Sequence, residues 1–177
     1  MLDNGANIET TDIDGLTPLI KASIEGNIDI VQYLLLEKAN VEAQSTSDFT
    51  ALMGACQAGH EEIVDKLLRK KASVNAVSKK GFSPLLLACY SGKTSIFKKL
   101  LAYPSIDIHL KTLTSGESPV MIAASRGDVE LVRLLIDKGA DIESKNKNQW
   151  TPLMAAVDGG VCVCVCVCVI LIKKNIV

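Results

Sequence analysis

The sequence predicts an all-α solenoid of stacked helix–turn–helix units joined by short β-hairpin-like loops, and three features in register support this. A Thr-Pro-Leu-like segment recurs at offsets of 33, 33, 35 and 33 residues. A glycine follows the Thr or Ser of each segment nine positions later, and a leucine pair begins seventeen positions later in the first three repeats and sixteen positions later in the fourth. Self-similarity at a period of roughly 20–50 residues is the signature of a repeat architecture.

Each repeat is expected to contain two helices. The first would be capped by the Thr or Ser of the segment, and proline would occupy its first turn, where a missing N–H is tolerated. The glycine would end this helix with a positive φ. The second helix has apolar residues at helical spacing, as at Ile28, Val31, Leu34 and Leu35. Neither helix can bury its apolar face alone, so neighbouring repeats must stack.

These columns divide the chain into successive repeats. A partial repeat (residues 1–11) precedes four full repeats, which we place at about 12–44, 45–77, 78–112 and 113–145, and a half repeat at 146–160. A tail follows at residues 161–177. The third repeat has two extra residues, around Pro104-Ser105 and Thr112–Ser115, so we expect its hairpin to be distorted. Because both ends interrupt the pattern, we expect the chain to be a fragment of a longer array.

Two stretches of residues resemble the ankyrin repeat. Asp12-Ile13-Asp14-Gly15-Leu16-Thr17-Pro18-Leu19 matches its D-x-x-G-x-T-P-L segment, and Lys138-Gly139-Ala140-Asp141-Ile142-Glu143 matches its G-A-D-V-N segment. The resemblance extends over residues 1–160 and implies the ankyrin fold. The chain departs from the family pattern in two columns. Apolar residues replace the family's first-helix histidine, and lysine replaces a glycine at Lys38 and Lys71, where a positive φ would cost about 1 kcal/mol per site.

Composition excludes several classes of protein. The net charge is −1 and the pI is near 6.1, so neither nucleic acid nor an anionic membrane is an expected partner. The longest apolar run, Val161–Ile172, is shorter than the roughly 20 residues that a membrane helix needs. No signal peptide is recognisable at the N-terminus. We therefore expect a location in the cytoplasm or the nucleus, with Cys56 and Cys89 as free thiols.

The tail repeats Val-Cys four times where the second helix of the fifth repeat should begin. Four thiols could bind a metal ion, but serial Cys-x-Cys is not the paired C-x₂₋₄-C spacing of a zinc site. We favour another interpretation, that residues 161–177 are a translated run of alternating GT nucleotides. A third alternative is that the segment covers the open end of the fifth repeat. We expect no native function from it.

Catalytic candidates are few, and we expect no enzyme activity, cofactor or metal. The histidines are His60, which occupies the family's Gly-His position, and His109, which lies in a loop of the third repeat. We expect a structural role for the first and a solvated side chain for the second. Cys56 and Cys89 share a column of the repeat with Ser23, Ala124 and Val157. Small residues at a closely packed site would explain the whole column.

The resemblance implies a binding surface, because ankyrin arrays generally bind partners on the concave side formed by hairpin tips and first helices. The residue before each cap is large and apolar in four repeats, as an exposed stripe for protein binding would require. Packing against the neighbouring hairpin is the alternative. The candidate residues on this surface are Leu16, Phe49, Phe82, Trp150, Asp14, Glu25, Gln57, Lys79, Lys80, Tyr90, Arg126 and Lys147. Their charges change from acidic in the first full repeat to basic in the later ones.

The expected function is therefore protein–protein recognition, as an adaptor or scaffold segment that binds another protein and is itself a monomer. The alternative is a targeting or regulatory ankyrin segment of a larger enzyme, ubiquitin-ligase adaptor or channel. The two differ in what the rest of the natural protein contains.

Overall fold

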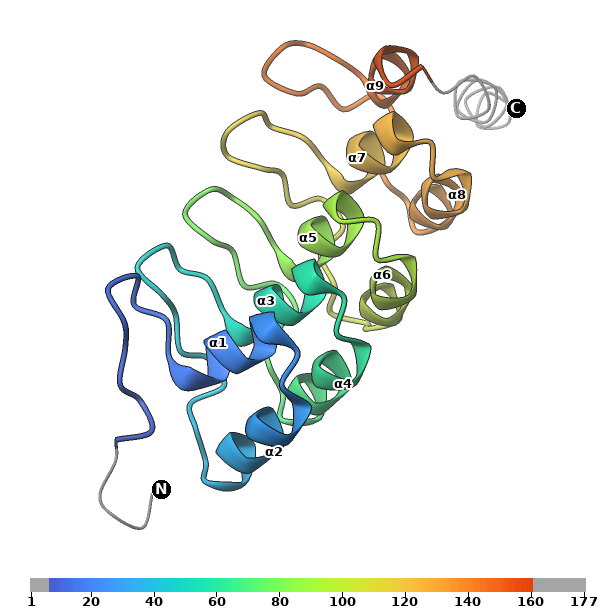
Figure 1. Ribbon diagram of the computed structural model, residues 1–177. Coiled ribbons are helices and arrows are strands. Elements are labelled where there is room, and N and C mark those ends of the chain that lie inside the picture. The colour runs from blue at the N-terminus through green and yellow to red at the C-terminus, as the bar shows by residue number, and fades with distance from the viewer. Residues whose placement is uncertain (1–6, 161–177) are drawn as a thin grey trace. The chain divides into compact units, whose positions relative to one another are not determined.

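The computed structural model describes residues 7–160 (Figure 1). These residues form two compact units that meet in sequence between Ile106 and Asp107. The first unit contains α1 (Pro18–Glu25), α2 (Ile28–Leu36), α3 (Ala51–Ala58), α4 (Glu61–Arg69), α5 (Pro84–Tyr90) and α6 (Thr94–Leu101). The second contains α7 (Pro119–Arg126), α8 (Val129–Asp137) and α9 (Pro152–Asp158). No strand is formed within residues 7–160, so the predicted all-α class is confirmed.

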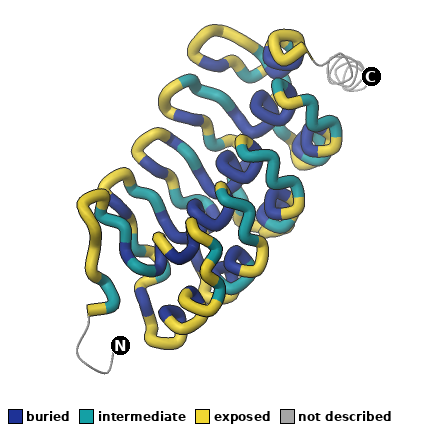
Figure 2. Tube along the Cα trace, viewed as in Figure 1, coloured by how far each residue is buried: buried dark blue, intermediate teal, exposed yellow. Residues whose placement is uncertain are grey.

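The helices of the first unit stack in two rows. The first helices of its three repeats, α1, α3 and α5, contact one another in order and lie beside the hairpin loops (Figure 1). The second helices, α2, α4 and α6, form the other row, and each packs on the first helix of its own repeat. The core between the rows is aliphatic, with Leu52, Met53, Ile63 and Leu85 at most 1% exposed. Figure 2 shows that the hairpin tips remain exposed.

The predicted caps begin the first helices. Thr17, Thr50, Ser83 and Thr151 have extended backbones, and each hydroxyl oxygen accepts a hydrogen bond from the backbone N–H three residues later, at 3.2–3.4 Å. Such caps satisfy one of the unpaired N–H groups at a helix start. Ser118 caps α7 by position, but its buried hydroxyl makes no such bond.

The column glycines adopt the positive φ that the sequence predicts, between 68° and 97°. Gly26, Gly59 and Gly127 are the C-caps of α1, α3 and α7. The prediction was wrong in detail at α5 and α9, where Ser91 and Gly159 are the C-caps, one residue before the glycine of the column. Lys38 and Lys71 also have positive φ, at 62° and 65°, as expected where lysine replaces glycine.

Two glycines of this column also make room for the next repeat. A Cβ atom on Gly26 would lie 2.4 Å from Cε1 of His60, and one on Gly59 would lie 2.7 Å from Cε of Lys93. His60 and Lys93 are the N-caps of α4 and α6. In both cases the residue at the same position of the following repeat covers the glycine, so a side chain on that glycine would have to displace it.

The second unit contains the fourth repeat and the first helix of the fifth. Helix α7 packs on α8 and on α9. Val157 in α9 is 61% exposed, although its column is fully buried at Ser23, Cys56, Cys89 and Ala124. The expectation of a packed site was therefore wrong for Val157, because no further described helix stacks on this side of α9. The predictions about residues 1–6, about the tail and about its four cysteines concern parts of the chain outside the described residues.

Candidate functional site

A polar side chain closes each hairpin loop and positions the residue before the cap. In the second repeat, the Oγ atom of Ser45 accepts from the backbone N–H of Phe49 at 3.2 Å, and in the third repeat Ser78 accepts from Phe82 at 3.1 Å. Asp12, Thr112 and Asn146 do the same for Leu16, Glu117 and Trp150. Such hydrogen bonds from the backbone to a nearby side chain stabilise turns in place of a helix or a strand, so these loops form tight turns.

Neighbouring hairpins of the first unit are also bonded to each other. The backbone N–H of Thr46 donates to the Asp14 carbonyl at 2.9 Å, and that of Lys79 donates to the Ser47 carbonyl at 3.0 Å. The Nζ atom of Lys79 donates to the Thr46 carbonyl at 2.7 Å. The three hairpins therefore form a connected edge, and Lys79 has part of its donor capacity committed to that edge.

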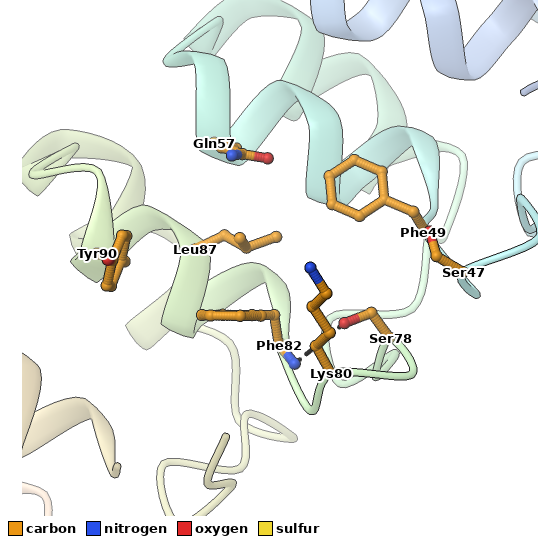
Figure 3. Close-up of a pocket in the computed structure, with 8 residues that line it drawn as sticks. All are labelled: Ser47, Phe49, Gln57, Ser78, Lys80, Phe82, Leu87 and Tyr90. Atoms are coloured by element: carbon orange, nitrogen blue, oxygen red, sulfur yellow. Dashed lines mark hydrogen bonds between the residues drawn. The ribbon is translucent and has the colours of Figure 1, made fainter. Parts of the chain in front are cut away.

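A pocket of about 390 Å³ lies between the second and third repeats, on the side of the hairpins and first helices (Figure 3). It brings together Phe49, Phe82, Gln57, Lys80 and Tyr90, all of which the sequence predicted as candidates, although 33 or more residues separate some of them. Its other lining residues are Ser47, Ser78 and Leu87. The volume falls within the range of roughly 300–1,000 Å³ usual for ligand pockets.

Aromatic rings form much of the pocket wall. The rings of Phe82 and Tyr90 meet edge to face, with centroids 6.0 Å apart and an interplanar angle of 73°. Tyr90 is 58% exposed, whereas Phe49 and Phe82 are half-buried. Leu16 at the first hairpin is also half-buried. These three side chains are thus neither fully buried nor fully exposed. The predicted stripe stays a prediction.

Lys80 supplies the charge of the pocket. Figure 3 shows its ammonium group pointing into the space between Phe49 and Leu87. Within residues 7–160, Lys80 takes part in no hydrogen bond or ion pair through its side chain. An ammonium group beside apolar walls, with no acceptor of its own, favours an anionic ligand group.

The remaining candidates are not among the residues that line this pocket. In the first unit, Asp14 and Glu25 are exposed, and the Glu25 carboxylate accepts from Asn27 at 3.0 Å. In the second unit, Arg126 and Lys147 are exposed, and Lys147 donates to the Leu113 carbonyl. Trp150 is 37% exposed and lines a shallow depression on α9 with Leu153, Met154, Val157 and Asp158.

The residues considered above for catalysis are two histidines and two buried cysteines. His60 lies at the start of α4, where its Nε2 atom is 3.1 Å from the Ile24 carbonyl, and His109 is exposed in its loop. Cys56 and Cys89 are fully buried, and neither forms a disulfide within the described part of the chain. Burial raises the pKa of the Cys56 thiol above its ordinary value, which disfavours the reactive thiolate. Within residues 7–160, no group of three His, Cys, Asp or Glu side chains could hold a metal ion.

The row of second helices has an ion-pair cluster. Lys99 in α6 lies 2.7 Å from Asp65 and 3.5 Å from Glu61, both in α4. The hydrogen bond to Asp65 and the charges of both carboxylates raise the pKa of Lys99. All three side chains are more than a third exposed, so the cluster contributes little to the free energy of unfolding. It does connect two neighbouring repeats.

Three residues that line the pocket, Ser47, Ser78 and Leu87, were not among the candidates predicted from the sequence. The signal for Ser78 was present, since Asp, Ser, Thr or Asn stands at the same place in every hairpin. Leu87 gave no such signal, because its column holds Lys21, Gly54 and Ile122 in the preceding and following repeats.

Comparison with known proteins agrees with this architecture. The family model described as "Ankyrin repeats (3 copies)" matches three overlapping stretches of the chain, residues 1–78, 36–112 and 85–176. Ankyrin repeat domain-containing protein 17 from human and from mouse is 39% identical over 50 residues, which is 28% of this chain. The chain spans about 2% of the length of these relatives.

None of the helices in residues 7–160 is long and apolar enough to cross a membrane. Ankyrin repeats are generally protein–protein interaction modules, and the family is typically non-catalytic. The family matches together extend over nearly the whole sequence and agree with the stacked helix pairs of both units. The chain belongs to the ankyrin-repeat family.

Proposed function

We propose that this chain recognises another protein through its hairpins and first helices, as an adaptor or scaffold segment. The observation that carries the proposal is the pocket between the second and third repeats. It combines half-buried rings of Phe49 and Phe82 with the exposed ring of Tyr90 and the ammonium of Lys80, which has no hydrogen-bond or ion-pair partner among residues 7–160. Large aromatic side chains in a depression, with a few polar groups around them, are characteristic of the anchor region of a protein interface.

The charges around this surface give the partner a preferred orientation. In the first unit, exposed Asp14 and Glu25 belong to the first full repeat, and exposed Lys79 and Lys80 belong to the third. A partner with the opposite order of charges would be steered to one register along these repeats. Arg126 and Lys147 add exposed basic groups in the second unit.

The proposal can be tested with a photoreactive amino acid in place of exposed Gln57, which lines the pocket. Partners captured in cells would be purified and their affinity for the unmodified chain measured. The triple charge reversal Lys79→Glu, Lys80→Glu and Arg126→Glu should then weaken binding at least about tenfold, as the loss of several exposed charge pairs would.

A matched control reverses three basic residues on the second helices and their ends, Lys70→Glu, Lys98→Glu and Arg133→Glu. All three are exposed, and the net charge changes by the same amount. Binding should be nearly unchanged in this variant. Equal losses in the two triple variants would point to a general charge effect and would remove the support for this surface.

A further inference from the structure

The pocket between the second and third repeats has a composition that selects the chemistry of its ligand. Its walls are Phe49, Phe82, Leu87 and the ring of Tyr90, which suit a large apolar side chain. Polar groups of Ser47, Ser78 and Gln57 lie around them. The Oγ atom of Ser78 already accepts a hydrogen bond from the backbone N–H of Phe82, so it has less capacity left to bond a ligand.

Charge complementarity identifies the second half of the ligand. Lys80 is the charged residue among those that line the pocket, and within residues 7–160 its ammonium has no partner. Lys79 is its neighbour and adds a second positive charge, although its Nζ atom already donates to the Thr46 carbonyl. A cation beside an apolar surface attracts both a carboxylate and the face of an aromatic ring.

We infer that this pocket binds an acidic peptide segment in which an aromatic side chain stands next to a carboxylate. The aromatic ring enters between Phe49 and Phe82, and the carboxylate pairs with Lys80. This inference rests on the proposed function, since it names the chemistry of the partner at the same surface. It predicts discrimination by charge sign, which an apolar depression alone would not give.

The test uses the full chain and three short peptides of the form acetyl-Gly-Ser-Gly-X-Z-Gly-Ser-Gly-amide. X-Z is Trp-Asp in the first peptide, Trp-Lys in the second and Ala-Asp in the third. Amide chemical shifts in ¹⁵N-labelled protein would report binding at Gln57, Lys80 and Leu87. A single anchor should give a dissociation constant of about 1 mM for the Trp-Asp peptide. Its binding should be about fivefold tighter than that of the Trp-Lys peptide, as an exposed or partly exposed ion pair allows.

Two variants separate the roles of charge and fold. Lys80→Gln should bring the Trp-Asp and Trp-Lys peptides to within about twofold of each other, because the pairing charge is gone. Lys70→Gln removes an equal charge at the end of α4, outside the pocket, and should keep the difference. Both residues are exposed, so both variants should fold, which their thermal unfolding midpoints would check.

The inference is overturned if Trp-Asp and Trp-Lys bind equally, if neither shifts the pocket amides, or if the preference survives in Lys80→Gln. These results would leave protein recognition by the wider surface intact, provided the triple charge reversal still weakens a captured partner. Conversely, a clear Trp-Asp preference together with an unaffected partner would support the ligand chemistry and contradict the proposed function.

Discussion

Gly26 meets two requirements at once, a left-handed backbone and a close neighbour. Its φ is 82°, and a Cβ atom there would overlap the imidazole of His60. Gly139 has a similar φ of 89°, but open space surrounds its Cβ position. Substitutions at Gly26 and at Gly139 therefore separate two contributions to the free energy of unfolding, that of the left-handed backbone and that of the contact between repeats.

We expect Gly139→Ala to lower the free energy of unfolding by about 1 kcal/mol, the cost of a left-handed alanine. Gly26→Ala should cost about 1–3 kcal/mol more, because the His60 ring must move. Urea unfolding of both variants measures the difference. In a double-mutant cycle, His60→Ala should remove most of the extra cost of Gly26→Ala. Equal destabilisation by the two glycine substitutions would show that His60 does not determine the spacing.

The sequence pattern predicted the positive φ at Gly26 but not the contact with His60. Turn chemistry is local, so a glycine at a helix end announces its conformation through the residues beside it. The imidazole comes from the next repeat, 34 residues later, and only the stacking distance brings the two together. For the same reason the candidate residues of the pocket were found individually, while the pocket itself was not.

Cys56 should make stability depend on pH in the alkaline range. Its pKa is raised in the folded chain, whereas an unfolded cysteine titrates near about 8.5. Below that pH the thiol is protonated in both states and adds no pH dependence. Above it only the unfolded chain releases the proton, so the free energy of unfolding falls by up to about 1.4 kcal/mol per pH unit.

The measurement is the difference in unfolding free energy between the original chain and Cys56→Ala, at pH 7 and at pH 9.5. This difference should shift by about 1 kcal/mol against the original chain at the higher pH. Ser23→Ala is the control, since Ser23 occupies the same buried column and does not titrate. A pH-independent difference for Cys56→Ala would mean that solvent reaches the thiol.

At the scale of helices, one column of the repeat can lie in two environments. Met53 in α3 is fully buried, whereas Met154 in α9 is 53% exposed. Sequence alone treats the two as equivalent, because both follow the cap at the same distance. Burial depends on whether another helix covers that side, and the pattern within one repeat contains no such information. The same reasoning explains the wrong expectation for Val157.

Met53→Ala should therefore lower the free energy of unfolding by about 2–5 kcal/mol, the usual cost of removing a buried methionine side chain. Met154→Ala should change it by less than about 1 kcal/mol, as expected for an exposed site. Chemical denaturation of the two variants tests this matched pair. A large loss in Met154→Ala would show that a segment outside the described residues packs on α9.

At the scale of the whole molecule, the first unit is a one-dimensional stack. Helix α3 contacts α1 on one side and α5 on the other, whereas α1 and α5 do not contact each other strongly. Stability in such a stack is nearly the sum of the repeats and of the interfaces between neighbours. The period of the sequence predicted such a stack of repeats. Because the repeats stack in chain order, the second repeat lies between the first and the third.

Amide hydrogen exchange in the first unit should reveal that arrangement. Met53→Ala weakens the middle repeat, so exchange should accelerate from α1 through α6, because both interfaces of α3 are affected. Ile20→Ala removes an equally buried side chain from α1, at the end of the stack, and should accelerate exchange mainly in α1 and α2. The α5 and α6 amides should keep most of their protection in that variant, because the intact helices α3 and α4 lie between them and the substituted α1. Uniform acceleration from α1 to α6 in both variants would instead mean that the three repeats unfold as one cooperative block.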